Sequence, residues 1–361
     1  MRIGWRRIIG ANPANGSPGS GGQLRSLQML RALAATSVVY YHTFCAPHIG
    51  TFGVDLFFVL SGLVIAMVAE SRMTSAAFLI NRITRIVPLY WLMTTALLIV
   101  AALRSDLLNS TTADVSNYLK SIFFIPYFKE NGVLQPMLAV GWTLNYEMLY
   151  YVVAAIVIAS CSDRFFGLAT SICVVAVWGI GHFLPANSAA REFLSADVLL
   201  EFIYGMLAWN IRGLKLFEKF PTWFLIGAIA ACYISMGYFE LRNFPIRSLT
   251  FGLPSFFIVI FAVRLEPKVT RLNQALVRWL THCGDASYAT YLSHLFVVQF
   301  VAKIISARFH AISPSGAIGA IASIIASLAV GSGVYILIDK KSVNLTRKLA
   351  RRYFPMERRI E

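Results

Sequence analysis

Charged residues are scarce in this chain. Of its 361 residues, 14% are charged and 57% are hydrophobic, and the mean hydropathy is +0.66. A soluble domain carries about 25% charged residues, so the composition excludes an ordinary water-soluble domain and indicates a polytopic membrane protein. Acidic residues are less common than basic residues, with 17 Asp and Glu against 32 Lys and Arg. The basic residues lie between apolar runs, as orientation signals do, so the net charge of +15 does not indicate nucleic-acid binding.

Cysteine patterns that would signal redox or metal chemistry are also missing. The five cysteines form no CxxC pair and have no metal-ligand spacing, and the six histidines are dispersed. We therefore predict no metal site and interpret the cysteines as packing residues. They are Cys45, Cys161, Cys173, Cys232 and Cys283.

No long polar linker interrupts the apolar runs, which predicts one membrane domain over residues 26–338. Residues 1–25 are basic and then rich in Gly, Ser, Pro and Asn, without the apolar core of a cleavable signal peptide. We expect this segment to be a disordered cytoplasmic tail. Residues 339–361 are expected to form a basic cytoplasmic tail that binds anionic headgroups.

The fold class predicted from these runs is all-α, a polytopic transmembrane bundle of about ten spanning helices. Lys and Arg concentrate in alternate connections, which predicts that both termini are cytoplasmic. The run at 118–128 is short and contains Pro126, so it is expected to be re-entrant or interfacial. The expected spans are 27–45, 52–70, 86–103, 142–160, 165–184, 195–211, 221–238, 247–263, 285–305 and 315–338.

The first span carries both an arginine and a histidine. At about 100° per residue, the interval from Arg31 to His42 closes about three turns, so the two side chains face the same way about 16 Å apart. Ionisable groups inside an apolar helix are costly and usually face a polar cavity or a partner. A cation near one end and a proton-transfer group near the other suggest a reaction path through the membrane.

The predicted orientation sorts other polar groups by depth. Asp55 and Glu147 each lie one to two turns inside the outer end of their spans, at the expected depth of His42. A carboxylate beside a histidine would fix its tautomer and stabilise the imidazolium formed on proton abstraction. Alternatively, Asp55 or Glu147 caps a helix or satisfies backbone donors near Gly53, and spacing alone slightly favours this structural role.

Two further patterns lie toward the cytoplasmic side. Arg82 and Arg85, three residues apart, could bind phosphates jointly, although spacing alone favours the alternative of topology signalling beside an aromatic belt. Tyr288, Tyr291 and His294 form a polar stripe that would line a cavity or pack against another helix.

Together these segments resemble the acyltransferase-3 family of integral membrane O-acyltransferases. Five blocks occur in the family's order across about residues 24–338, and the order makes the resemblance specific. The blocks are Leu30-Arg31-Ala32-Leu33-Ala34 followed by His42, Gly53-Val54-Asp55-Leu56-Phe57-Phe58-Val59-Leu60-Ser61-Gly62, Arg82-x-x-Arg85 with Pro88, Trp142-Thr143-Leu144-Asn145-Tyr146-Glu147, and Ser287-Tyr288-x-x-Tyr291-Leu292-x-His294.

The resemblance implies a cytoplasmic acyl-CoA donor, usually acetyl-CoA, and an acyl group delivered to a carbohydrate at the outer face of a bacterial inner membrane. It carries Arg31 and His42 over as the paired essential residues. Asn145 and Leu63 depart from the commoner family residues, which bears on acceptor details because neither change removes a titratable group. No SGNH-type domain is expected after residue 338. This stand-alone form resembles the enzymes that modify exopolysaccharides, O-antigens or lipochito-oligosaccharides.

In the mechanism we expect, Arg82 and Arg85 bind the CoA phosphates, and Arg31 could join them. The pantetheine arm would pass the polar stripe with Tyr288, Tyr291 and His294, and His42, oriented by a carboxylate, would act as general base on a sugar hydroxyl.

Two alternatives stay open at this point. A flippase for a lipid-linked glycan could use the same polar layer, and a scaffold of an export complex could use the charges only to pair helices. The sequence does not identify the acceptor, which could be a polysaccharide or a lipid-linked oligosaccharide. It also leaves the acyl group and the oligomeric state open.

Overall fold

The computed structural model describes residues 24–71, 73–104, 112–214, 219–269, 271–309 and 313–353. Within these ranges the chain is helical and forms no β-strand, apart from an isolated antiparallel bridge between Phe128 and Leu134. The predicted all-α class is therefore confirmed. Most of the predicted N-terminal tail lies outside the described residues, as do residues 354–361.

Between Arg25 and Ile211 the described residues form eight α-helices and two short 3₁₀-helices. In order these are α2 (Arg25–Tyr41), α3 (Gly53–Ala69), α4 (Ser75–Leu103), α5 (Val115–Ile122), η2 (Ala139–Gly141), α6 (Trp142–Ser160), α7 (Phe166–Gly181), α8 (Ala189–Leu194), η3 (Asp197–Leu200) and α9 (Glu201–Ile211).

The second half continues with helices that include two π-helical turns. They are α10 (Thr222–Leu241), η5 (Ser248–Gly252), α11 (Leu253–Val269), α12 (Gln274–Asp285), α13 (Ser287–Arg308), α14 (Ala317–Val334), η6 (Tyr335–Asp339) and α15 (Lys340–Tyr353).

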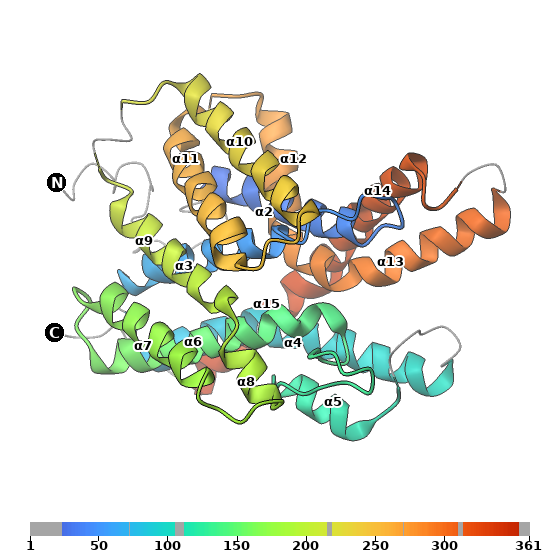
Figure 1. Ribbon diagram of the computed structural model, residues 1–361, viewed down its shortest axis with the longest axis horizontal. Coiled ribbons are helices and arrows are strands. Elements are labelled where there is room, and N and C mark those ends of the chain that lie inside the picture. The colour runs from blue at the N-terminus through green and yellow to red at the C-terminus, as the bar shows by residue number, and fades with distance from the viewer. Residues whose placement is uncertain are drawn as a thin grey trace.

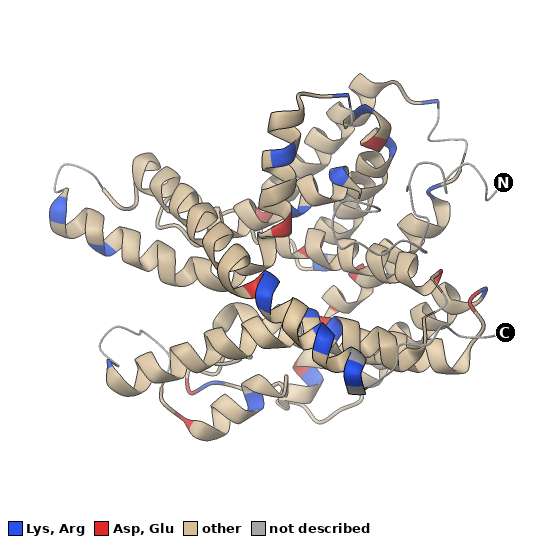
Figure 2. Cartoon of the chain, turned by 180° about the vertical axis from the view of Figure 1, so that it is seen from behind, with Lys and Arg blue, Asp and Glu red and all other residues tan. Residues whose placement is uncertain are grey.

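The helices gather around α2 and α3 (Figure 1). Helices α10 to α12 lie on one side of this pair, and α4, α6 and α7 lie on the other, while α13 and α14 extend from the body as a hairpin. Helix α15 packs along α4. Lys and Arg are sparse along α10 and α14 and recur along α15 (Figure 2). Helices α10 and α14 are thus apolar, as spans require, and α15 is a basic helix.

Seven helical segments in the described part of the chain are long and apolar enough to cross a membrane. They are Ser75–Leu103, Ala139–Ser160, Ala189–Ile211, Thr222–Leu241, Ser248–Val269, Ser287–Arg308 and Ala317–Ala350.

The three other predicted spans coincide with α2, α3 and α7, which are shorter. The molecule is thus a multi-pass membrane protein, while the predicted count of about ten is not confirmed. The sides on which the termini lie stay a prediction.

Helices α3 and α9 approach each other at two glycines. A Cβ on Gly62 would lie 2.1 Å from the carbonyl oxygen of Phe202, and one on Gly205 would lie 2.0 Å from that of Val59. Real Cβ atoms do not come this close to backbone, so only glycine permits this contact. The contact fixes α3, which carries several residues of the site, against the bundle.

Helix α4 begins earlier than the predicted span at 86–103. Thr74 caps its N-terminus by accepting a hydrogen bond from the Ala77 amide at 3.3 Å, and the helix runs from Ser75 through Pro88. Arg82 and Arg85 are therefore part of this helix and not of a connecting loop.

Helices α12 and α15 were not among the predicted elements. Both are amphipathic rather than uniformly apolar, so a search for long apolar runs passes over them.

The run at 118–128 is only partly helical. Helix α5 ends at Ile122, and its last turn is held against α4 because Tyr90 donates to Ser121 O at 3.2 Å and Trp91 donates to Ile122 O at 2.8 Å. The segment therefore lies against the bundle, as expected, and Pro126 falls in the loop where the helix has already ended.

Candidate active site

Four helices enclose a cavity of about 60 Å³ near the centre of the bundle. Each contributes at least one polar side chain, which is expensive in an apolar interior unless it serves a ligand or a partner. Four of the predicted site residues are in its wall, namely Arg31, Glu147, Tyr288 and Tyr291. The remaining lining residues are Val54, Phe57, Phe58, Ser61, Thr143 and Leu144.

Arg31 reaches the cavity from α2. Its Nε donates to the Ser287 hydroxyl at 3.3 Å, and its guanidinium lies 5.9 Å from the centre of the Phe57 ring. The arginine predicted from the sequence pattern therefore faces a polar space, as the cost of burying it in hydrocarbon requires.

Glu147 lies in the same wall. Its carboxylate accepts a hydrogen bond from the Ser61 hydroxyl at 3.0 Å and a short one from the Tyr151 hydroxyl. Because Arg31 and Glu147 line one cavity, a cation and an anion share it, and each reduces the cost of burying the other.

Arg82 and Arg85 have different surroundings. Arg85 Nη1 donates to Asp339 Oδ2 at 2.7 Å, and its guanidinium lies 5.2 Å from the centre of the Tyr288 ring. The Arg82 guanidinium lies 5.9 Å from the Phe78 ring centre, and its buried Nε has no hydrogen-bond partner in the described part of the chain. An unbonded buried N–H is costly, so Arg82 retains a donor that an anionic ligand could satisfy.

His42 ends α2 and lies against His294 of α13. His42 Nδ1 is 2.9 Å from Val38 O and 3.3 Å from His294 Nε2, while His294 Nδ1 is 2.7 Å from Tyr291 O. A carbonyl oxygen can only accept, so the hydrogen-bond pattern assigns a proton to Nδ1 of both rings. His294 Nε2 is then an acceptor that faces His42, and His42 Nε2 keeps a free lone pair suited to a general base.

His42 is not in the cavity wall. His294 is fully buried. Its Nε2 contacts His42 and its Nδ1 contacts the carbonyl oxygen of Tyr291, whose side chain lines the cavity. The Tyr291 hydroxyl lies 3.0 Å from both Val140 O and the Thr143 hydroxyl. In this structure, His42 is thus linked to the cavity through His294 and Tyr291 rather than lining it.

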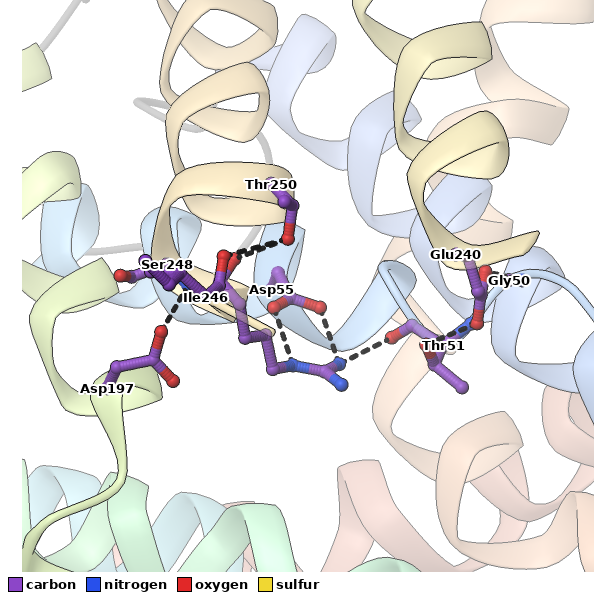
Figure 3. A network of polar contacts seen from close by, with 9 residues as sticks. Gly50, Thr51, Asp55, Asp197, Glu240, Ile246, Ser248 and Thr250 are labelled. Atoms are coloured by element: carbon purple, nitrogen blue, oxygen red, sulfur yellow. Dashed lines mark hydrogen bonds and ion pairs between the residues drawn. The ribbon is translucent and has the colours of Figure 1, made fainter. Parts of the chain in front are cut away.

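The expectation that Asp55 or Glu147 orients His42 requires correction. Asp55 is fully buried, and both of its oxygens accept from Arg247, with Nε–Oδ1 at 2.8 Å and Nη2–Oδ2 at 2.7 Å (Figure 3). Glu147 has the hydroxyl partners described above. Histidine, not carboxylate, is the neighbour of His42, because the α2–α3 loop turns Asp55 toward η5 rather than toward α13.

The pair of Asp55 and Arg247 belongs to a wider network (Figure 3). Arg247 Nη2 also donates to Thr51 O at 3.2 Å, and the Glu240 carboxylate accepts from the amides of Gly50 at 2.6 Å and Thr51 at 3.0 Å. These contacts fasten the loop that follows His42 to α10 and η5. The structure thus favours the structural alternative for Asp55.

Sequence reasoning missed several contributors to the site. Arg247 interrupts the start of an apolar run, which is a usable signal for a buried ion pair. Ser61 was noted only as part of a motif block, and Asp339 had been placed in a tail. Nothing in local spacing could have paired Asp339 with Arg85, since 254 residues separate them.

No group of three or more His, Cys, Asp or Glu side chains suited to a metal ion occurs among the residues that the structure describes.

The sequence matches the family model described as an acyltransferase domain over residues 24–336. This chain belongs to the acyltransferase-3 family. The match includes every predicted site residue, so the cavity and the histidine pair described above lie within the acyltransferase domain.

Named relatives agree with this placement. The chain is 31% identical over 297 residues to the exopolysaccharide production protein ExoZ of Rhizobium meliloti (strain 1021). The aligned part covers 81% of this chain and 89% of ExoZ. The chain is 23% identical over 321 residues to the O-acetyltransferase OatA of Staphylococcus aureus (strain NCTC 8325 / PS 47), covering 77% of this chain and 51% of that protein. No solved structure matches the chain.

Proposed function

We propose that this membrane acyltransferase transfers an acyl group, with acetyl favoured, from cytoplasmic acyl-CoA to a hydroxyl of a cell-surface or exported carbohydrate. The observation that carries the proposal is a cavity with Arg31 and Tyr291 in its wall, which is linked through Tyr291 and His294 to His42. The Nδ1 bond of His42 to Val38 O leaves Nε2 of that ring as the nitrogen that can accept a proton. Its relatives' names, an exopolysaccharide production protein and an O-acetyltransferase, support the acceptor class and the acyl group.

The donor would bind at the arginine side of the cavity. Arg31, Arg82 and Arg85 come from α2 and α4, and guanidinium groups bind phosphate oxygens through several N–H donors at once. The phosphates of acyl-CoA would contact these arginines, and the apolar and aromatic wall with Tyr288 and Tyr291 would hold the pantetheine arm.

His42 would act as general base. Its Nε2 takes the proton of the acceptor hydroxyl while the hydroxyl oxygen attacks the thioester carbonyl, and the proton then passes to the departing CoA thiolate. His294 presents Nε2 as a neutral acceptor and thereby holds the His42 ring in the required tautomer. General-base assistance of this kind contributes about 10²- to 10⁴-fold in rate.

Tyr291 must move for the thioester to reach His42. Its side chain lines the cavity, its ring centre lies 5.9 Å from that of His294, and its hydroxyl contacts Val140 O and the Thr143 hydroxyl. We propose that entry of the pantetheine arm displaces this ring. Glu147 would balance the charge of Arg31 and hold the Ser61 hydroxyl in the cavity wall.

The decisive experiment measures release of free CoA from acetyl-CoA by purified full-length protein in the presence of cell-envelope glycan. We expect His42→Ala to lose transfer by about 10²-fold or more while its elution profile and thermal stability match the wild type. A well-folded His42→Ala protein with wild-type turnover would reject the assignment. A flippase for a lipid-linked glycan would instead move glycan without any dependence on acyl-CoA.

We further propose an inner-membrane location in a bacterium with both termini cytoplasmic. The uneven distribution of Lys and Arg along the chain supports this orientation. Reporter fusions at residue 24 and after residue 353 would both read as cytoplasmic, and a periplasmic reading at either point would contradict the orientation.

A further inference from the structure

Asp339 contacts Arg85, one of the proposed donor-side arginines, from the far end of the chain. It ends the π-helical turn η6, which interrupts an otherwise continuous helix from α14 to α15. Only 1% of Asp339 is exposed, and its Oδ2 accepts from Arg85 Nη1 at 2.7 Å. π-Turns inside helices often mark functional positions, because the extra residue redirects the side chains that follow.

The contact differs from the other buried pair of aspartate and arginine. Asp55 binds Arg247 through two parallel bonds, whereas Asp339 uses one oxygen and leaves Oδ1 buried without a hydrogen-bond partner among the described residues. Two parallel bonds are the preferred geometry for a structural pair. The single contact uses one N–H of Arg85 and leaves the rest of its guanidinium available.

Arg85 is held from two directions. Asp339 bonds one nitrogen, and the Tyr288 ring lies against the guanidinium at 5.2 Å. Tyr288 is itself fixed, since its hydroxyl donates to Ile86 O at 2.7 Å. A long flexible side chain is thus confined beside Tyr288, which lines the cavity where the donor is proposed to bind.

We propose that Asp339 is a positioning residue of the donor site, which orients Arg85 so that its remaining N–H donors face the phosphate groups of acyl-CoA. This inference rests on the proposed function. It also assigns a role to the junction of η6 and α15, because the start of the basic C-terminal helix becomes part of the donor site.

The test is equilibrium binding of CoA itself to detergent-purified full-length protein, which needs no acceptor. Asp339→Asn keeps the shape and removes the charge, and we expect the Kd for CoA to rise about tenfold, as expected for loss of a charge-assisted contact. In an Arg85→Gln background the same substitution should change the Kd by less than about twofold, because Asp339 acts through Arg85.

Three outcomes overturn the inference. An unchanged Kd in Asp339→Asn removes the positioning role, and a lower Kd means that Asp339 competes with the phosphates. An equal loss in the Arg85→Gln background means that Asp339 supports the fold generally. Glu70→Gln is the matched control, because Glu70 bonds Arg212 at 3.2 Å away from the cavity, and its Kd should equal that of the wild type.

The same measurement separates this inference from the proposed function. If Arg82→Gln and Arg85→Gln also bind CoA like the wild type, the donor site itself is wrong. If those two variants weaken binding and Asp339→Asn does not, only the role of Asp339 fails.

Discussion

Asp55→Asn distinguishes a structural carboxylate from a catalytic one. In the native protein Asp55 is fully buried and accepts two bonds from Arg247, whose side chain is 29% exposed. Breaking a buried ion pair costs about 3–5 kcal/mol. Water can reach part of Arg247, so we discount this to about 2–3 kcal/mol for Asp55→Asn.

The free energy of unfolding is measured by titrating detergent-purified protein with SDS, and turnover is measured on the same samples and divided by the folded fraction. We expect the loss of stability above, with turnover per folded molecule within about tenfold of the wild type, far from the roughly 10²- to 10⁴-fold effect of a lost general acid or base. The second variant, Asp55→Asn with Arg247→Gln, replaces both charges. It should be more stable than the sum of the single changes predicts, because neither member of the pair is left without its partner.

The opposite pattern would refute this reasoning. A variant with wild-type stability and turnover reduced by about 10²-fold or more would mean that Asp55 acts in catalysis after all. Glu70→Gln serves as the control for an exposed pair, since Glu70 is 59% exposed at its contact with Arg212. Its cost should stay within about 1 kcal/mol.

The remaining predictions address the site and the packing around it. His294→Phe removes the acceptor for His42 Nδ1, so kcat should fall about ten- to hundredfold with KM for acetyl-CoA unchanged; a change in KM alone would contradict the assignment. Arg82→Gln should raise KM for acetyl-CoA about tenfold with little change in kcat, checked by steady-state CoA release, and an unaffected KM would exclude a phosphate contact. Gly205→Ala places a Cβ 2.0 Å from Val59 O and should lower the free energy of unfolding by about 1–3 kcal/mol in the SDS titration, whereas wild-type stability would show that α3 and α9 can separate without cost.

Much of this fold could be predicted because apolar runs in a membrane protein must become helices. With no water to satisfy backbone groups, every long apolar segment forms its hydrogen bonds internally. Each of the ten predicted spans coincides with a helix for this reason, and Arg31 faces a cavity as its cost in hydrocarbon required. Helices α12 and α15 were missed because their polar faces break the apolar pattern.

Contacts between polar side chains of different helices were harder to predict than the polar residues themselves. Depth placed His42, Asp55 and Glu147 at a common level, but depth does not tell which faces of neighbouring helices meet. The α2–α3 loop is fastened by Glu240 and directs Asp55 to Arg247, so the carboxylate turns away from the histidine. Such pairings depend on helix rotation, which a single sequence does not encode locally.

The position of Tyr291 implies that its side chain moves in the proposed mechanism. Arg31 and Tyr291 line the cavity, whereas His42 lies outside its wall and contacts His294, whose Nδ1 bonds to the carbonyl oxygen of Tyr291. In the proposed mechanism the ring leaves its contacts with Val140 and Thr143, which together are worth about 1–3 kcal/mol. We expect the binding energy of the proposed acyl-CoA donor to offset this cost, so that occupation of the donor site shifts the Tyr291 ring toward the displaced state.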